Sequence, residues 1–111
     1  MAQGFNMPRG GGNINQLMKQ AQKMQADITR MQEELNEREF EASAGGGVVK
    51  AVVYGRKEVK SIELAEEIVD PDDVEMLQDL VVAAVNEALR KADETVAAEM
   101  SKLTGGMNLG F

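Results

Sequence analysis

Near the N-terminus, apolar residues recur at alternating steps of three and four, and this spacing constrains the fold more than any other feature of the sequence. The residues are Ile14, Leu17, Ala21, Met24, Ile28, Met31 and Leu35. A heptad spacing of this kind predicts a helix with one narrow apolar seam. Asn13 or Asn15 can cap its first turn. A seam of this length packs well only against another helix, so the sequence indicates a helical partner.

The segment after this helix has the pattern of an antiparallel β-meander. Apolar and polar residues alternate over 39–44, which is the period of a half-buried strand. Gly45-Gly46-Gly47 then allows the positive φ values of a tight hairpin turn. The β-branched run 48–54 and the segment 59–64 follow, with a second turn at 55–58 between them. The sequence therefore predicts three antiparallel strands in consecutive order.

The middle strand is apolar on both faces, and this is the main argument from the sequence for a homodimer. One face carries Val49, Ala51 and Val53, and the other carries Val48, Val52 and Tyr54. A strand with two apolar faces is covered on both, whereas one layer of helix from the same chain covers only one. We therefore expect a partner subunit on the second face. The predicted dimer-interface residues are Val48, Val52, Tyr54, Leu77 and Val81.

The sequence Asp70-Pro71-Asp72-Asp73 predicts the start of a long second helix. Asp70 is expected to be the N-cap and Pro71 the first helical residue, with two carboxylates facing the positive end of the helix dipole. After Pro71, no Gly or Pro occurs before Gly105, and a helix of that length spans about 50 Å. Its apolar face is broad up to Leu89 and thins beyond, so the second half is predicted to project as an arm.

The residue types that are absent exclude most enzyme classes. The 111 residues include no Cys and no His, which removes disulfides, zinc sites of Cys and His, and Ser–His or Cys–His nucleophile pairs. Carboxylate sites for Mg²⁺ or Ca²⁺ stay open in principle, but we expect no metal, no cofactor and no small-molecule substrate. No secretory signal is present, and no apolar run approaches the roughly 20 residues of a membrane span. We expect a non-enzymatic, cytoplasmic protein without a membrane partner.

The charge is distributed unevenly along the chain. A net charge of −7 argues, taken alone, against nucleic acid as a partner. Residues 1–32, however, carry a net charge of +3, whereas residues 66–87 hold eight carboxylates and no basic residue. The sequence leaves open whether the acidic segment repels DNA or faces a partner.

The glycine content at both ends predicts how the chain is organised. Residues 1–13 form a Gly-rich leader that is expected to be disordered, because glycine runs bury too little surface to offset their chain entropy. Residues 14–104 are expected to form a single α+β domain, and residues 105–111 a flexible tail.

Four segments stand in a characteristic order along the chain. They are LMKQAQKMQ (17–25), AGGGVVK (44–50), VKSIE (59–63) and EMLQDLVVAAVNEA (75–88). Together they resemble the YbaB/EbfC family of bacterial nucleoid-associated proteins, over roughly residues 14–107. Two positions depart from the family pattern: Ala65 stands where Asp is common, and Tyr54 where the turn usually carries Asn.

The resemblance implies a tweezer-like, intertwined homodimer that binds double-stranded DNA with weak sequence preference in the nucleoid. It also implies an influence on nucleoid organisation and gene expression. In this family, DNA binding is attributed to the first helix and the end of the last. Carried over to this chain, the DNA-binding residues are Lys19, Lys23, Arg30, Arg90, Lys91 and Lys102. No catalytic residue is implied.

One alternative from a different class stays open. A helix, a hairpin and a helix also describe a subunit of a prefoldin-like chaperone, and eight Met would supply an adaptable binding surface. Against it, prefoldin-type helices are of similar length, whereas the predicted helices here differ by about ten residues. A hexameric mass would favour the chaperone, and a dimeric mass the DNA-binding protein.

Overall fold

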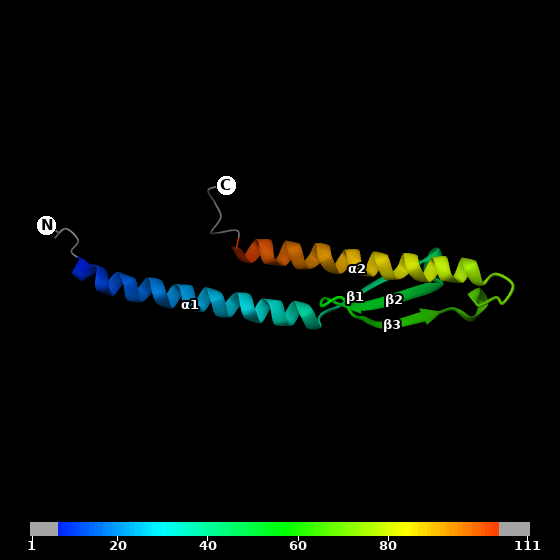
Figure 1. The fold of residues 1–111 in the computed structure, drawn as a ribbon, viewed down its shortest axis with the longest axis horizontal. Coiled ribbons are helices and arrows are strands. Elements are labelled where there is room, and N and C mark those ends of the chain that lie inside the picture. The colour runs from blue at the N-terminus through cyan, green and yellow to red at the C-terminus, as the bar shows by residue number, and fades with distance from the viewer. Residues whose placement is uncertain (1–6, 105–111) are drawn as a thin grey trace. The chain divides into compact units, whose positions relative to one another are not determined.

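The computed structural model describes residues 7–104, with side chains from 14 to 103. Its elements in chain order are α1 (Met7–Glu37), β1 (Glu39–Ala44), the 3-10 turn η2 (Gly45–Gly47), β2 (Val49–Tyr54), β3 (Val59–Leu64), the 3-10 turn η3 (Glu66–Ile68) and α2 (Val74–Thr104) (Figure 1). This order confirms the predicted α+β fold. The chain divides into two compact units, Met1–Met31 and Gln32–Phe111, and each is described by itself. The tail predicted at 105–111 lies outside the described residues.

In the first unit, α1 begins earlier than the sequence predicted. The helix starts at Met7 rather than near residue 14, so Asn13 and Asn15 lie within it and do not cap its start. The part of the expected leader at 7–13 is therefore helical, and residues 1–6 lie outside the described part of the chain. The glycines at 10–12 misled the prediction, because each disfavours a helix by about 1 kcal/mol relative to alanine without forbidding one.

The apolar seam of α1 lies largely open in this unit. Ile14 and Leu17 are 49% and 61% exposed, while Met24, Ile28 and Met31 are half-buried. An amphipathic helix gains most of its stability from packing this face. The seam is thus an apolar surface on which a further element can pack.

In the second unit, the three strands form the predicted meander in the order β1-β2-β3. β1 and β2 pair from Glu39↔Tyr54 to Ala44↔Val49, and β2 continues into β3 with an irregularity at Val52/Val53. The hairpin between β1 and β2 is the glycine turn, where Gly46 has φ 74° and ψ 21°. The predicted strands and their turns are confirmed.

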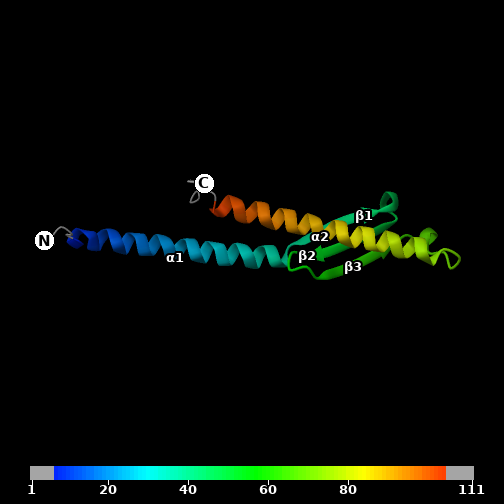
Figure 2. The ribbon, with the colours of Figure 1, turned by 45° about the horizontal axis from the view of Figure 1, so that its top comes forward.

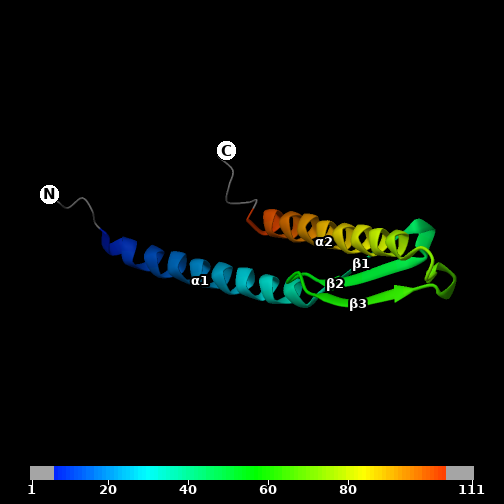
Figure 3. The same ribbon diagram turned by 45° about the vertical axis from the view of Figure 1, so that its right-hand side comes forward.

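The core of the second unit lies between α2 and one face of β1 and β2 (Figures 2 and 3). Val49, Ala51 and Val53 are completely buried, as the alternation in the sequence indicated. Their counterparts on the helix are Ala84, Ala88 and Ala92, which are also completely buried. Alanines spaced by four residues line one side of a helix, and their small size lets the helix backbone approach the sheet closely.

The helix-side face of β3 is left uncovered. Val59, Ile62 and Leu64 pair with core residues of β2, so they share the apolar face of the sheet. They are nevertheless 43%, 39% and 40% exposed, because α2 packs across β1 and β2. We call these three residues the β3 strip.

The opposite face of the sheet carries ion pairs as well as apolar side chains. Lys50 Nζ lies 3.5 Å from Glu41 and 3.9 Å from Glu63, and Lys60 Nζ lies 2.7 Å from Glu39. The hydrogen bond to Glu39 and the charge of its carboxylate raise the pKa of Lys60. Val52 and Tyr54 stand half-buried among these charges. This face is therefore more polar than the middle strand alone suggested.

The start of α2 differs by three residues from the prediction. Helix α2 begins at Val74, and Asp73 is its N-cap, since Asp73 Oδ1 accepts a hydrogen bond from the Met76 amide at 3.2 Å. Asp70, predicted as the cap, instead accepts from the Asp72 amide at 2.9 Å and closes a turn before the helix. Each Asp prefers to bond a nearby amide, so the local sequence alone does not say which one caps.

Replacing the observed cap tests this assignment. We expect Asp73→Ala to lower the free energy of unfolding by about 1 kcal/mol, because an amide of the first turn loses its acceptor. Asp72→Ala is the matched control, with the same change of charge and no side-chain hydrogen bond lost; its effect should stay within about 0.5 kcal/mol. Urea denaturation followed by circular dichroism measures both. Equal effects of the two substitutions would contradict the assignment.

Candidate nucleic-acid interface

Three basic residues form a stripe along one side of α1. Lys19, Lys23 and Arg30 follow each other by four and seven residues, which places them within a sector of about 40° around the helix axis. The apolar seam lies roughly 150° away on the same helix. All three side chains are exposed. We call this set the basic stripe; it remains presented to solvent even when a partner covers the seam.

Two of the three cations in the basic stripe are free of ion pairs within the described part of the chain. Lys19 and Lys23 have no ion pair among the residues whose side chains are described, whereas Arg30 lies 3.1 Å from Asp27. The Arg30 pair is exposed, and exposed pairs of this type contribute little stability. Arg30 can therefore leave Asp27 and pair with a phosphate at a small cost in free energy.

The basic residues predicted on α2 are already engaged. Arg90 pairs with Glu87 and lies 4.0 Å from Glu94, and Lys102 Nζ lies 3.5 Å from Glu99. Lys91 Nζ donates to the backbone carbonyl of Glu41 at 2.5 Å, which ties α2 to β1. Around the helix axis, Lys91 and Lys102 lie within about 20° of each other, whereas Arg90 lies roughly 100° or more away from both. The structure thus does not gather the α2 cations into a stripe.

The residues predicted for the dimer interface lie on different surfaces of the second unit. Leu77 and Val81 are partly buried and pack against its own core, as does Val48 at the end of the glycine turn. Val52 and Tyr54 are half-buried on the face of the sheet that carries the ion pairs. The β3 strip, which the sequence analysis did not single out, is the more exposed apolar surface. The parity of Ile62 and Leu64 was a signal in the sequence, whereas Val59 joins their face only through the irregularity at Val52/Val53.

The acidic segment lies around η3 and the start of α2. Seven carboxylates form no ion pair within the described part of the chain: Glu66, Glu67, Asp70, Asp72, Asp73, Glu75 and Asp79. So dense a negative charge repels phosphates. This end of the second unit therefore has the opposite charge to the basic stripe.

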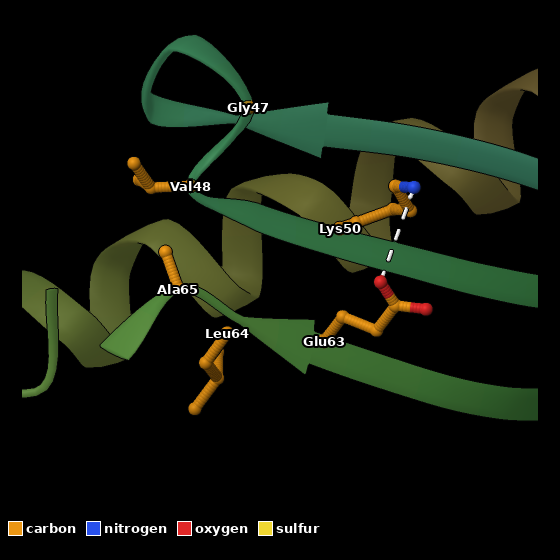
Figure 4. A pocket seen from close by; sticks show the side chains of 6 residues that line it. All are labelled: Gly47, Val48, Lys50, Glu63, Leu64 and Ala65. Atoms are coloured by element: carbon orange, nitrogen blue, oxygen red, sulfur yellow. Dashed lines mark ion pairs between the residues drawn. The ribbon is translucent and has the colours of Figure 1, made fainter. Parts of the chain in front are cut away.

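A cavity of about 250 Å³ opens beside the end of the glycine turn (Figure 4). Its lining combines Val48, Leu64 and Ala65 with the ion pair of Lys50 and Glu63. Pockets that bind cofactors or substrates usually have volumes of about 300 Å³ or more and bury most of the ligand. This cavity is smaller than that.

Within residues 14–103, no three carboxylates gather in a way that could hold a metal ion. No described helix is long and apolar enough to cross a membrane.

Sequence analysis assigned no role to Arg56, which occupies the turn between β2 and β3. Its guanidinium contacts Glu37, Glu58, the carbonyl of Asn36 and the ring of Tyr54. The sequence contained one signal of this cluster, since Glu58 stands two residues from Arg56. Tyr54 is equally near in the sequence, whereas Asn36 and Glu37 come from the end of α1 and meet Arg56 only in the folded chain.

Helix α1 thus presents two exposed lysines without ion pairs among the described side chains on one side and an apolar seam on the other. The sequence pattern of the YbaB/EbfC DNA-binding family matches residues 10–107. The chain therefore belongs to the YbaB/EbfC DNA-binding family. This confirms the resemblance found in the sequence.

Curated relatives are similar over nearly their whole length. A protein of Acetivibrio thermocellus is 66% identical over 107 residues, covering 96% of this chain and 94% of the relative. One of Thermoanaerobacter pseudethanolicus is 61% identical over 100 residues, covering 90% of each chain. Both are named nucleoid-associated proteins. These relatives come from bacteria, as the sequence analysis expected.

A solved structure supports the fold. The uncharacterized protein HP0035 from Helicobacter pylori matches with a TM-score of 0.66, covering 80% of this chain and 94% of that chain. At 18% identity the likeness shows the arrangement of helices and strands alone.

Proposed function

We propose that this protein is a nucleoid-associated, DNA-binding homodimer that contacts phosphates through the basic stripe of α1. The observation that carries the proposal is the pair Lys19 and Lys23, which are exposed and have no ion pair among the described side chains. Membership in a DNA-binding family names the polyanion. The names of the relatives support a place in the nucleoid, and an influence on nucleoid organisation and gene expression is part of the proposal.

The proposed mechanism is phosphate neutralisation by exposed cations. Lysine and arginine release counterions from the duplex, and this supplies affinity without reading the bases. The described surface offers few aromatic side chains for stacking, since aromatics make up 4% of the sequence. We therefore expect weak sequence preference, arising from the shape of DNA. Arg90, Lys91 and Lys102 are proposed as secondary contacts, because each already has a partner within the protein.

The proposed homodimer would cover the apolar surfaces that the single chain leaves open. These are the seam of α1 and the β3 strip. Exposed apolar surface of this extent is typical of interaction sites. We favour the β3 strip over the surface of Val52 and Tyr54 as the sheet part of the interface, because ion pairs surround the latter.

Adding charge to the β3 strip tests this interface. We expect Ile62→Glu/Leu64→Glu to convert a dimer into a monomer of 12.1 kDa, because two unpaired carboxylates would be buried in each half of the interface. Ser43→Glu adds a carboxylate to the opposite face and should leave the dimer intact. Light scattering coupled to size exclusion measures the mass. If the double variant stays dimeric and folded, the interface lies elsewhere.

The DNA proposal is tested by the dependence of binding on salt. If three cations from each subunit contact phosphates, the affinity of the dimer for duplex DNA should fall by about 10³ between 50 and 200 mM salt. A mobility shift at both concentrations, with a mass measurement on the same preparation, gives the result. Absence of binding at low salt, or binding that ignores salt, would contradict the proposal.

The length argument against a prefoldin-like chaperone does not hold in the structure. Helices α1 and α2 have 31 residues each, because α1 starts at Met7. Membership in a DNA-binding family instead supports the first of the two classes. A hexameric mass, together with suppression of the aggregation of an unfolded client protein, would favour the chaperone function instead.

A further inference from the structure

The end of α1 is fastened to the turn between β2 and β3 by backbone hydrogen bonds. The Gly55 amide donates to the Arg38 carbonyl at 2.9 Å, and the Arg56 amide donates to the Asn36 carbonyl at 3.3 Å. The last carbonyls of a helix have no partner within the helix. The turn of the sheet therefore supplies donors that α1 cannot supply to itself.

The side chain of Arg56 strengthens this junction with charge. Its guanidinium donates to Glu37 Oε2 at 2.9 Å and to Glu58 Oε1 at 2.8 Å, with a longer bond of 3.4 Å to the Asn36 carbonyl. It also lies 4.1 Å from the centre of the Tyr54 ring. We call this arrangement the Arg56 clamp. The planar guanidinium of arginine can hydrogen-bond to two carboxylates while it stacks on an aromatic ring, and the ammonium group of lysine cannot form the same set of contacts.

Arg56 combines three properties. It is one residue that joins the helix end, the turn and the ring, whereas Arg90 and Lys102 pair within their own helix. A positive group at the C-terminal end of a helix also favours the helix dipole. The hydrogen bond to Glu58, followed by that to Glu37, raises the pKa of Arg56, so the guanidinium keeps its charge at every ordinary pH.

We propose that Arg56 is a positioning residue for DNA binding, which holds the C-terminal turn of α1 on the sheet so that the helix carrying the basic stripe is preorganised. α1 is one continuous helix from Met7 to Glu37. Fraying of its last turn would loosen the helix that presents Lys19 and Lys23. An ordered helix loses less entropy when it meets a ligand. This inference rests on the DNA-binding function proposed above.

The decisive variant removes negative charge and should nevertheless weaken DNA binding. Glu37→Gln/Glu58→Gln takes both carboxylates from the clamp and makes each chain more positive. Electrostatics alone predicts tighter binding; the clamp predicts binding weaker by about fivefold. Arg56→Ala should weaken binding to a similar degree, and Arg56→Lys should not restore it. Tighter binding by the double Gln variant would overturn the proposal.

Two further measurements separate positioning from direct contact. If Arg56 touches phosphate, Arg56→Ala should lower the slope of log affinity against log salt by about 2 per dimer; a positioning residue leaves the slope unchanged. Arg38→Ala is the matched control, because it removes the same charge near the helix end without removing a clamp contact. It should leave the affinity within about twofold of the wild type.

Hydrogen exchange completes the test and does not depend on DNA. The amides of residues 34–37 should exchange faster in Arg56→Ala than in wild type or Arg38→Ala, with the dimer mass unchanged. If the wild-type protein does not bind DNA but this exchange difference is found, the result contradicts the proposed DNA-binding function and still supports the Arg56 clamp. If Arg56→Ala binds DNA as tightly as the wild type, the result contradicts the positioning role of Arg56 but not the proposed DNA-binding function.

Discussion

The double substitution Lys19→Ala/Lys23→Ala is expected to lower the affinity for duplex DNA by on the order of 10² at 50 mM salt. It removes both unpaired lysines from each subunit of the proposed dimer, and thus four of six phosphate contacts. The slope of log affinity against log salt should fall by about 3.6. A mobility shift or fluorescence anisotropy titration at several salt concentrations measures both quantities. Dimer mass and helix content should not change, since both side chains are exposed and form no ion pair with the other described side chains.

The control for this result is a variant with the same loss of charge on α2. Arg90→Ala/Lys102→Ala also removes two cations from each chain, but both are already neutralised by neighbouring carboxylates. Its affinity should stay within about threefold of the wild type. If the α2 variant loses more affinity than the α1 variant, the principal contact lies on α2 and the basic stripe is secondary.

The second large effect concerns the stability of the second unit. A Cβ added to Gly55 would collide with the carbonyl oxygen of Leu35 and would lie 2.8 Å from its carbonyl carbon. Leu35 is itself buried at the end of α1. Because a backbone atom is struck, the helix end must move away from the sheet. We expect Gly55→Ala to lower the free energy of unfolding by about 3 kcal/mol.

Gly46 provides the comparison for this prediction. It has a positive φ of 74°, but no atom lies within 4 Å of a Cβ placed there. Gly46→Ala therefore suffers only from backbone strain, about 1 kcal/mol. Urea denaturation of both variants at one protein concentration gives the two values. A loss at Gly46 that equals or exceeds the loss at Gly55 would show that conformation outweighs close approach in this chain.

The sequence determined the strands and turns well. The alternation over 39–44, the glycine triplet and the β-branched run each have one strong local solution, and the structure adopts all three. The buried positions Val49, Ala51 and Val53 also followed from strand parity, since neighbouring side chains must point to opposite faces. Local sequence patterns are reliable where one period dominates.

The helix boundaries were less well determined. Asp70 and Asp73 can both accept from a nearby amide, and only the path of the chain into α2 makes Asp73 the cap. At the other end of the chain, the glycines at 10–12 predicted an end to the helix, yet α1 continues through them. A penalty of about 1 kcal/mol for each glycine in a helix is small enough for the surrounding structure to outweigh it.

The sequence by itself determined an α+β chain with a heptad seam, an antiparallel meander and a stripe of basic residues opposite that seam. Only the tertiary structure decided which cations are engaged, because contacts such as the hydrogen bond from Lys91 to the Glu41 carbonyl join residues far apart in the sequence. It also decided that α2 covers two strands and leaves the β3 strip open, and that Arg56 closes the end of α1. Periodicity fixes which side of an element a residue occupies, whereas its neighbours depend on how the elements pack.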